Sequence, residues 1–185
     1  MAHRNHRAVV LVEGASDRRA LEALAERHGR DLAAEGISIA PIGGAQAIGS
    51  VLARLESGVK VAGLCDAGEE GHFRRALERA GLGSALTRAG MEALGFYVCE
   101  ADLEDELIRA LGAAAVEQVV AEQGELPSFR TFQKQPAWRG RPVEEQLRRF
   151  IGTHSGRKIE YGALLVRALD LTHVPRPLDG VLAHV

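Results

Sequence analysis

The chain has 185 residues, of which 46% are hydrophobic and 26% are charged, and this composition suits one globular unit with a core of ordinary size. No apolar stretch approaches the roughly 20 residues of a membrane span, and residues 1–7 (MAHRNHR) lack the apolar middle of a secretory signal. We therefore expect a cytoplasmic protein with no membrane partner. The two cysteines, Cys65 and Cys99, provide neither a disulfide framework nor a zinc ligand set.

Strand and helix patterns alternate from residue 9 onward. Continuous or alternating apolar residues predict four strands, at residues 9–12, 37–39, 59–64 and 96–99. Apolar residues at helical spacing predict helices between them, with apolar faces at residues 20–25, 48–55 and 73–80, and an acidic helix start at residues 100–107. Ser16 or Asp17 is expected to cap the first helix. The repetition predicts an α/β fold, with a mostly parallel central sheet and helices on both faces.

The pattern changes at about residue 121. Helix-breaking residues interrupt the next segment, at Gly124, Pro127, Pro136, Gly140 and Pro142. Pro142 is expected to start a helix that runs to Phe150, and Lys158 to open another that runs to Leu169. We therefore expect residues 121–185 to form a helical, basic C-terminal extension packed on an α/β body of residues 8–120.

Two carboxylates stand where an apolar run ends and a helix begins. Glu13 follows the first predicted strand and Asp66 follows the third. Because the carboxyl ends of parallel strands gather at one edge of an open sheet, both acids are expected to meet there. Carboxylate oxygens are the ligands that Mg²⁺ and Mn²⁺ prefer, so this placement predicts metal-assisted phosphate chemistry.

Basic charge is concentrated in residues 128–158. Eight basic residues stand there against two acidic ones, a local balance of +6 in a chain whose formal net charge is −2. Half of the eight aromatic residues lie in the same segment, namely Phe129, Phe132, Trp138 and Phe150. Cations for phosphates and aromatic faces for bases are typical of nucleic-acid contacts. A solvated basic face whose aromatic residues belong to the core explains the segment equally well.

Three short motifs carry a family resemblance. Residues 11–17 (LVEGASD), 63–66 (GLCD) and 103–105 (LED), in this order, resemble the motifs of the TOPRIM domain, a metal-binding module of topoisomerases, primases and certain nucleases. Within that group the chain is most similar to the TOPRIM half of the overcoming-lysogenization-defect (OLD) nucleases, whose first motif also has an acid four residues after the glutamate. The match covers approximately residues 8–111. The resemblance implies a TOPRIM-like Rossmannoid fold and metal-dependent DNA cleavage.

The resemblance also implies a role for individual side chains in a site for two Mg²⁺ or Mn²⁺ ions. Glu13 would be a metal ligand or general base, Asp17 would reach the same site one helical turn on, and Asp66 would be the central bridging ligand. Candidates for the second cation are Glu100, Glu104 and Asp105. Lys158 would lie near the scissile phosphate and neutralise charge in the transition state. The surrounding DNA contacts would come from the basic segment, through Arg130, Lys134, Arg139, Arg141 and Lys158.

Each of these residues also has a plainer interpretation. Glu13 fits a turn before Gly14, and Asp17 fits a helix N-cap. Acids at residues 100–106 complement a helix dipole without any metal, and Lys158 fits an ordinary basic loop. The chain also departs from the TOPRIM pattern, because Asp66-Ala67-Gly68 stands where these domains usually have Asp-x-Asp. The missing acid would have to come from Glu69, from Glu70 or from the later acidic cluster.

Three classes of function compete at this point. The first is a metal-dependent DNA endonuclease, which hydrolyses phosphodiester bonds. The alternative is a non-catalytic or partner-dependent TOPRIM module that binds nucleic acid. A receiver-like or phosphatase-like protein is disfavoured, because it would not need the basic aromatic segment. The OLD nucleases carry an ATPase half, but no Gly-x-x-x-x-Gly-Lys-Ser/Thr pattern occurs here. An ATPase partner would therefore be a separate subunit, or the protein works without one.

Overall fold

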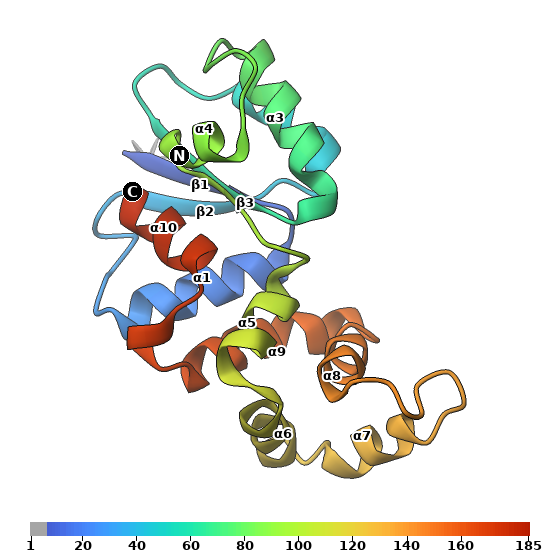
Figure 1. Ribbon diagram of the computed structural model, residues 1–185. Coiled ribbons are helices and arrows are strands. Elements are labelled where there is room, and N and C mark those ends of the chain that lie inside the picture. The colour runs from blue at the N-terminus through green and yellow to red at the C-terminus, as the bar shows by residue number, and fades with distance from the viewer. Residues whose placement is uncertain (1–6) are drawn as a thin grey trace.

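The computed structural model describes residues 7–185 and contains a four-stranded parallel sheet with strand order β2-β1-β3-β4 (Figure 1). The strands are β1 (Ala8–Val12), β2 (Ile37–Pro41), β3 (Lys60–Cys65) and β4 (Phe96–Val98). Every residue of β1 is buried, as expected for a central parallel strand that is covered on both faces. The predicted α/β fold with a parallel sheet is confirmed.

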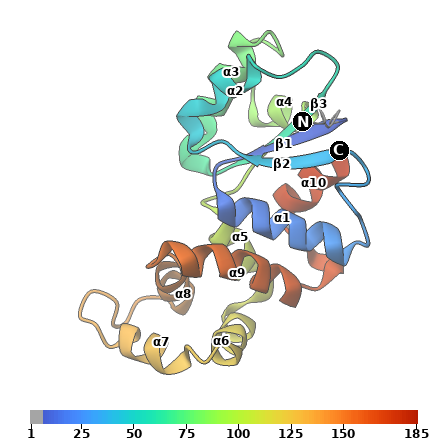
Figure 2. The same ribbon diagram turned by 180° about the vertical axis from the view of Figure 1, so that it is seen from behind.

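Helices cover both faces of this sheet (Figures 1 and 2). On one face lie α2 (Ile48–Leu52), α3 (Glu70–Arg79) and α4 (Arg88–Ala93). On the other face lie α1 (Ala15–Arg27) and α10 (Arg176–His184), with α9 (Ser155–Ala168) packed along α1. Three short 3₁₀ turns complete this part, at Ala45–Ala47, Ala67–Glu69 and Leu171–His173. Among the helices of residues 7–185, none has the length and apolar character needed to cross a membrane.

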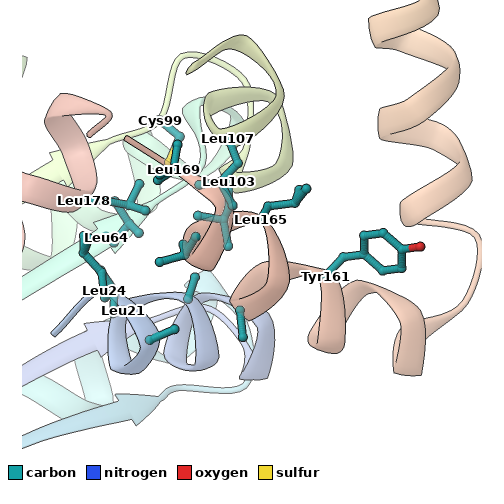
Figure 3. Close-up of a cluster of buried hydrophobic side chains, with 14 of the residues drawn as sticks. Leu21, Leu24, Leu64, Cys99, Leu103, Leu107, Tyr161, Leu165, Leu169 and Leu178 are labelled. Carbon is teal, nitrogen blue, oxygen red and sulfur yellow. The ribbon is translucent and has the colours of Figure 1, made fainter. Parts of the chain in front are cut away.

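The larger core joins the sheet to helices from distant parts of the chain. Leu21 and Leu24 of α1 gather with Leu64 of β3 and Leu178 of α10 (Figure 3). Leucines of α5 (Leu103–Leu111) and α9 extend the same cluster. The close approach of α9 to α1 requires a glycine, since a Cβ at Gly162 would lie 2.9 Å from the Ser16 carbonyl oxygen. The C-terminal helices are thus part of the body that carries the sheet.

A helical lobe stands apart from the sheet, below it in both Figure 1 and Figure 2. It contains α6 (Ala113–Glu122), α7 (Leu126–Gln133) and α8 (Val143–Ile151). Pro127 does not break the chain as its type suggests, because it lies in the first turn of α7, where its missing N–H costs nothing. A division at residue 120 stays a prediction. It would pass through α6, and it would separate α9 and α10 from the sheet on which their helical layer rests.

Candidate functional site

Glu13 and Asp66 lie side by side at the carboxyl edge of the sheet. Strands β1 and β3 pair directly, with Val12 opposite Leu64, so the residues that follow them leave the sheet together. The backbone N–H of Asp66 donates a hydrogen bond of 2.9 Å to Oε1 of Glu13. The strand-end placement inferred from the apolar runs is therefore what brings the two acids into contact.

Asp17 is buried beside them in the first turn of α1. It is 8% exposed, and its Oδ2 accepts a 2.8 Å hydrogen bond from the backbone N–H of Gly14. The helix begins at Ala15 with Gly14 as its N-cap, so the prediction that Ser16 or Asp17 occupies the N-cap is wrong. Asp17 instead stands at the third helical position and reaches back to an amide that the helix leaves unpaired.

The carboxylates of this edge raise one another's pKa. The pKa of Asp66 rises to about 7, first because burial penalises its charged form and then because Glu13, Asp17 and Asp102 are negative. Burial also raises the pKa of Glu13 and of Asp17, against the hydrogen bonds that they accept from backbone amides. Lys158 lowers all three, but not enough to offset burial. Keeping these carboxylates ionised close together therefore costs free energy, and a bound cation would reduce that cost.

Glu104 and Lys158 bring to the same place an ion pair in which the carboxylate is buried and the lysine is partly exposed. Lys158 Nζ lies 3.1 Å from Oε2 of Glu104, whose side chain is only 4% exposed. Burial lowers the pKa of Lys158, but the negative charges of Glu104, Asp66 and Asp17 raise it above its usual value. The other carboxylate oxygen, Glu104 Oε1, is buried and has no hydrogen-bond partner among the described residues. A buried carboxylate oxygen without a donor calls for a ligand or a cation.

Asp102 is a charged neighbour of this site that is not among the residues predicted from the sequence. It is the N-cap of α5, where Oδ1 accepts a 2.9 Å hydrogen bond from the Asp105 N–H, and its Oδ2 lies 2.6 Å from a guanidinium nitrogen of Arg148 in α8. Its charge adds to burial in raising the pKa of Asp66, Asp17 and Glu104. The sequence feature that could have indicated Asp102 is its position directly before Leu103, where the apolar face of a helix begins.

Two predicted ligands of the second cation point elsewhere. Glu100 and Asp105 pair with Arg109, at 2.9 Å and 3.7 Å, and Glu106 does so at 2.7 Å. Glu100 does not share a helical face with Glu104, because α5 begins only at Leu103. Glu100 therefore lies in the turn before the helix, where the nearest cation is Arg109.

The position of the missing second acid is occupied by a 3₁₀ turn, Ala67–Glu69. Glu69, in this turn, adds to burial in raising the pKa of Glu13, whereas Glu70 pairs with Arg88 at 2.6 Å. Of the two substitutes considered, Glu69 is thus the one whose charge reaches the site.

The donor set fits a hard cation in its chemistry, since it consists of carboxylate oxygens that include the unpartnered Glu104 Oε1. Within residues 7–185, however, no group of three or more His, Cys, Asp or Glu side chains is arranged to hold a metal ion. The carboxylates do not converge on one point, because Glu13 and Asp17 each accept a backbone hydrogen bond and because like charges repel.

The aromatic residues of the basic segment form the core of the lobe. Phe129, Phe132 and Phe150 are at most 9% exposed, and Phe129 and Phe150 lie with ring centroids 5.1 Å apart. The interpretation of these phenylalanines as stacking faces for bases is therefore wrong. Trp138 is half-buried and stacks on Phe132.

The cations of the same segment are unequal. Arg130 pairs with Glu117, and Arg141 lies 3.6 Å from Glu145. Lys134 and Arg139 are exposed and have no carboxylate partner in the part of the chain that the structure describes.

Comparison with known proteins places this geometry among related folds. Residues 6–67 match the family described as overcoming lysogenization defect protein-like, TOPRIM domain. The C-terminal region of the Xanthomonas campestris pv. campestris OLD protein is 22% identical with a TM-score of 0.74, over 97% of this chain and 91% of that chain. The C-terminal region of the Burkholderia pseudomallei OLD protein is 18% identical with a TM-score of 0.73, over 97% of each chain. No curated protein sequence shows significant similarity.

Proposed function

We propose that this chain, whose residues 6–67 match the OLD-like TOPRIM domain family and whose fold is similar to the C-terminal region of OLD proteins, is a divalent-metal-dependent DNA endonuclease whose site is the carboxyl edge of the sheet. The observation that carries the proposal is the direct contact of Glu13 with the backbone of Asp66, beside the ion pair of Lys158 with the buried Glu104. A buried group of carboxylates with one lysine suits hydrolysis of a phosphodiester, in which negative charge builds up on oxygen.

Glu13, Asp17, Asp66 and Glu104 would hold the metal. When bound, Mg²⁺ or Mn²⁺ supplies Lewis acidity toward the phosphate and toward water, and two such ions can serve the attacking and leaving oxygens. Glu100 and Asp105 are not included, because Arg109 already neutralises them. Glu69 is included as the substitute for the second aspartate of the TOPRIM pattern, on the strength of its effect on Glu13.

The protein's own groups then divide the remaining work. The pKa of Asp66, about 7 in the metal-free protein, would fall when a cation binds its carboxylate, so the role proposed for this residue is that of a ligand. Lys158 offers a positive charge beside the carboxylates, where it can stabilise the scissile phosphate. Glu104 positions the Lys158 ammonium group through their 3.1 Å contact. Loss of Lys158 would leave the buried Glu104 carboxylate without its cation.

DNA is the proposed partner, and the basic segment is the proposed route by which it reaches the site. An acidic centre alone repels a polyanion, so nearby cations are needed to admit it. Lys134 and Arg139 are free to bind phosphates, whereas Arg130 and Arg141 would first have to leave exposed ion pairs, which are worth little in water. A separate ATPase subunit stays a prediction of the family resemblance.

A second candidate is a TOPRIM module that binds nucleic acid without cutting, or that cuts only with a partner. Two observations favour it. Ala67 and Gly68 stand where a second aspartate is usual, and the described carboxylates do not form a ready group of three. Calorimetric titration with Mg²⁺ and Mn²⁺ separates the two candidates. A nuclease is expected to bind the metal ion, and Asp66→Asn should weaken this binding. A module that does not cut is expected to give no heat of metal binding.

The decisive experiment incubates purified protein with supercoiled and linear DNA in Mg²⁺ or Mn²⁺ and follows nicking on a gel. Asp66→Asn is expected to abolish cleavage. Asp105→Asn is the matched control, since it removes the same charge from a carboxylate that contacts Arg109 and not the site. Cleavage by the Asp66 variant at the wild-type rate would contradict the proposal, and loss of cleavage in the Asp105 variant would return that residue to the ligand set.

A further inference from the structure

Helix α3 carries a group of arginines that has no part in the site described above. Arg75 and Arg79 are exposed on its outer face, Arg74 is half-buried, and Arg54 follows the neighbouring α2. None of the four has a carboxylate within ion-pair distance among the described residues. In the basic segment the pattern is the reverse, since most of its cations are paired, namely Arg130, Arg141, Arg148, Arg157 and Lys158.

The acids of α3 are engaged elsewhere, which leaves the positive charge of its outer face uncompensated. Glu70 Oε2 lies 2.6 Å from Arg88, and Glu78 Oε1 accepts a 2.8 Å hydrogen bond from the backbone N–H of Leu86. Both contacts lead toward the segment that carries α4. An exposed face with free guanidinium groups and no competing carboxylate is complementary to the phosphate backbone of a nucleic acid.

This face is continuous with the acidic centre. The chain passes from Asp66 through one 3₁₀ turn directly into α3. Side chains of a helix tilt toward its N-terminus, and a Cβ placed on Gly71 would lie 3.1 Å from Nη1 of Arg75, so the Arg75 guanidinium reaches back over the first turn. A Cβ on Gly68 would meet no atom within 4 Å, so the space beside Gly68, in the turn between Asp66 and α3, is open.

The spacing suits a duplex that lies across the carboxyl edge. With a rise of about 1.5 Å per residue, Arg75 and Arg79 lie about 7 Å and about 13 Å along the axis from the start of α3. These distances correspond to roughly two and four base pairs at about 3.4 Å each. In both Figure 1 and Figure 2, α3 lies above the sheet and α8 below it. The two basic surfaces therefore flank the acidic centre from opposite sides.

We propose that the outer face of α3, formed by Arg75 and Arg79 with Arg74 and Arg54 beside them, binds the phosphate backbone of duplex DNA on the side of the acidic centre opposite the helical lobe. The inference rests on the proposed function, because it gives the DNA a second set of contacts at the same site.

The test measures binding of a fluorescently labelled duplex in Ca²⁺ over a series of salt concentrations, with the DNA checked for integrity on a gel. The double change Arg75→Ala with Arg79→Ala is expected to lower the slope of log affinity against log salt by about 1.8, because each phosphate contact contributes about 0.9. From the same linear dependence of log affinity on log salt concentration, the double variant is expected to bind DNA roughly 60-fold more weakly than wild type near 0.1 M salt. The double change to lysine, which keeps both charges, is expected to keep the slope near the wild-type value.

The matched control is Arg167→Ala with Arg176→Ala, which removes the same net charge from α9 and α10 at exposed residues paired with Glu26 and Glu92. An equal loss of slope in this control would overturn the α3 surface, because the effect would then be one of net charge. Wild-type binding with an unchanged slope in the α3 variant would overturn this surface alone and leave the proposed function standing. Absence of wild-type binding would overturn both.

Discussion

Replacing Asp66 by asparagine is expected to stabilise the metal-free protein at neutral and higher pH, although the same change is expected to abolish the proposed cleavage. Asp66 is half-buried among other carboxylates, and its pKa rises from 3.8 to about 7. Each pKa unit corresponds to about 1.4 kcal/mol, so roughly three units set an upper bound of about 4 kcal/mol. Water reaches part of the side chain, and screening reduces this to on the order of 1–2 kcal/mol.

The sign follows from proton linkage. Below about pH 4 the carboxyl group is protonated in both the folded and the unfolded chain, so it carries no charge penalty in either. Between about pH 4 and about pH 7 the unfolded chain loses this proton while the folded protein retains it, and the wild-type protein loses stability as the pH rises. Above about pH 7 the penalty is constant. Asparagine has no such proton, so its advantage should grow over the same interval.

The measurement is thermal unfolding by circular dichroism in EDTA, over a pH series that spans this interval. For a protein of this size about 1 kcal/mol shifts the melting temperature by roughly 2–4 °C, so the variant should melt roughly 2–8 °C above wild type on the alkaline side. Asp105→Asn serves as the control, since it removes the same charge from a carboxylate that pairs with Arg109, and no stabilisation is expected from it. A variant that melts at or below wild type at every pH would refute the charge-crowding argument.

Three further changes separate the roles of the other residues. Lys158→Ala should lower the single-turnover cleavage rate by about 10²- to 10³-fold and change DNA affinity little, and an unaltered rate would exclude Lys158 from the reaction. Arg139→Ala with Arg141→Ala should lower the salt slope of DNA binding by about 1.8 if both contact duplex phosphates, and an unchanged slope would leave this part of the lobe an ordinary solvated surface. Phe150→Ala should destabilise the protein by about 3–5 kcal/mol in denaturant titration, because the ring is 3% exposed in the lobe core. Intact stability combined with weaker single-strand binding would instead support base stacking at Phe150.

The sheet and its edge were predictable because they depend on short-range patterns. Continuous apolar runs identify buried parallel strands, and each run ends at the residue that the site uses. Glu13 and Asp66 could therefore be brought together from the sequence alone, since parallel strands end at a common edge. The direction in which the side chains of Glu100 and Asp105 point could not be predicted from the sequence, because it depends on the position of Arg109. Arg109 attracts Glu100 and Asp105, and no periodicity indicates that contact.

The role of the aromatic residues was ambiguous for a related reason. Composition places Phe129, Phe132 and Phe150 in one segment but does not tell a base-stacking surface from a small core. The packing of α7 against α8 shows that these rings form a small core. That packing depends on α7, which contains Pro127, a residue type that usually ends a helix. Arg157 illustrates the same limit, because its pairing with Glu125 joins residues that are far apart in the chain.

The close contact of α9 with α1 has a consequence for the order in which the protein becomes competent. A chain synthesised only as far as residue 120 already contains Glu13, Asp66 and Glu104, but the lysine that pairs with Glu104 has not yet been made. Until α9 docks through Gly162 onto α1, Glu104 has no cation to accompany its burial. The proposed catalytic centre would thus be completed only by a late, long-range packing event, and a partly made or partly unfolded chain would hold its acids without the lysine proposed to stabilise the scissile phosphate.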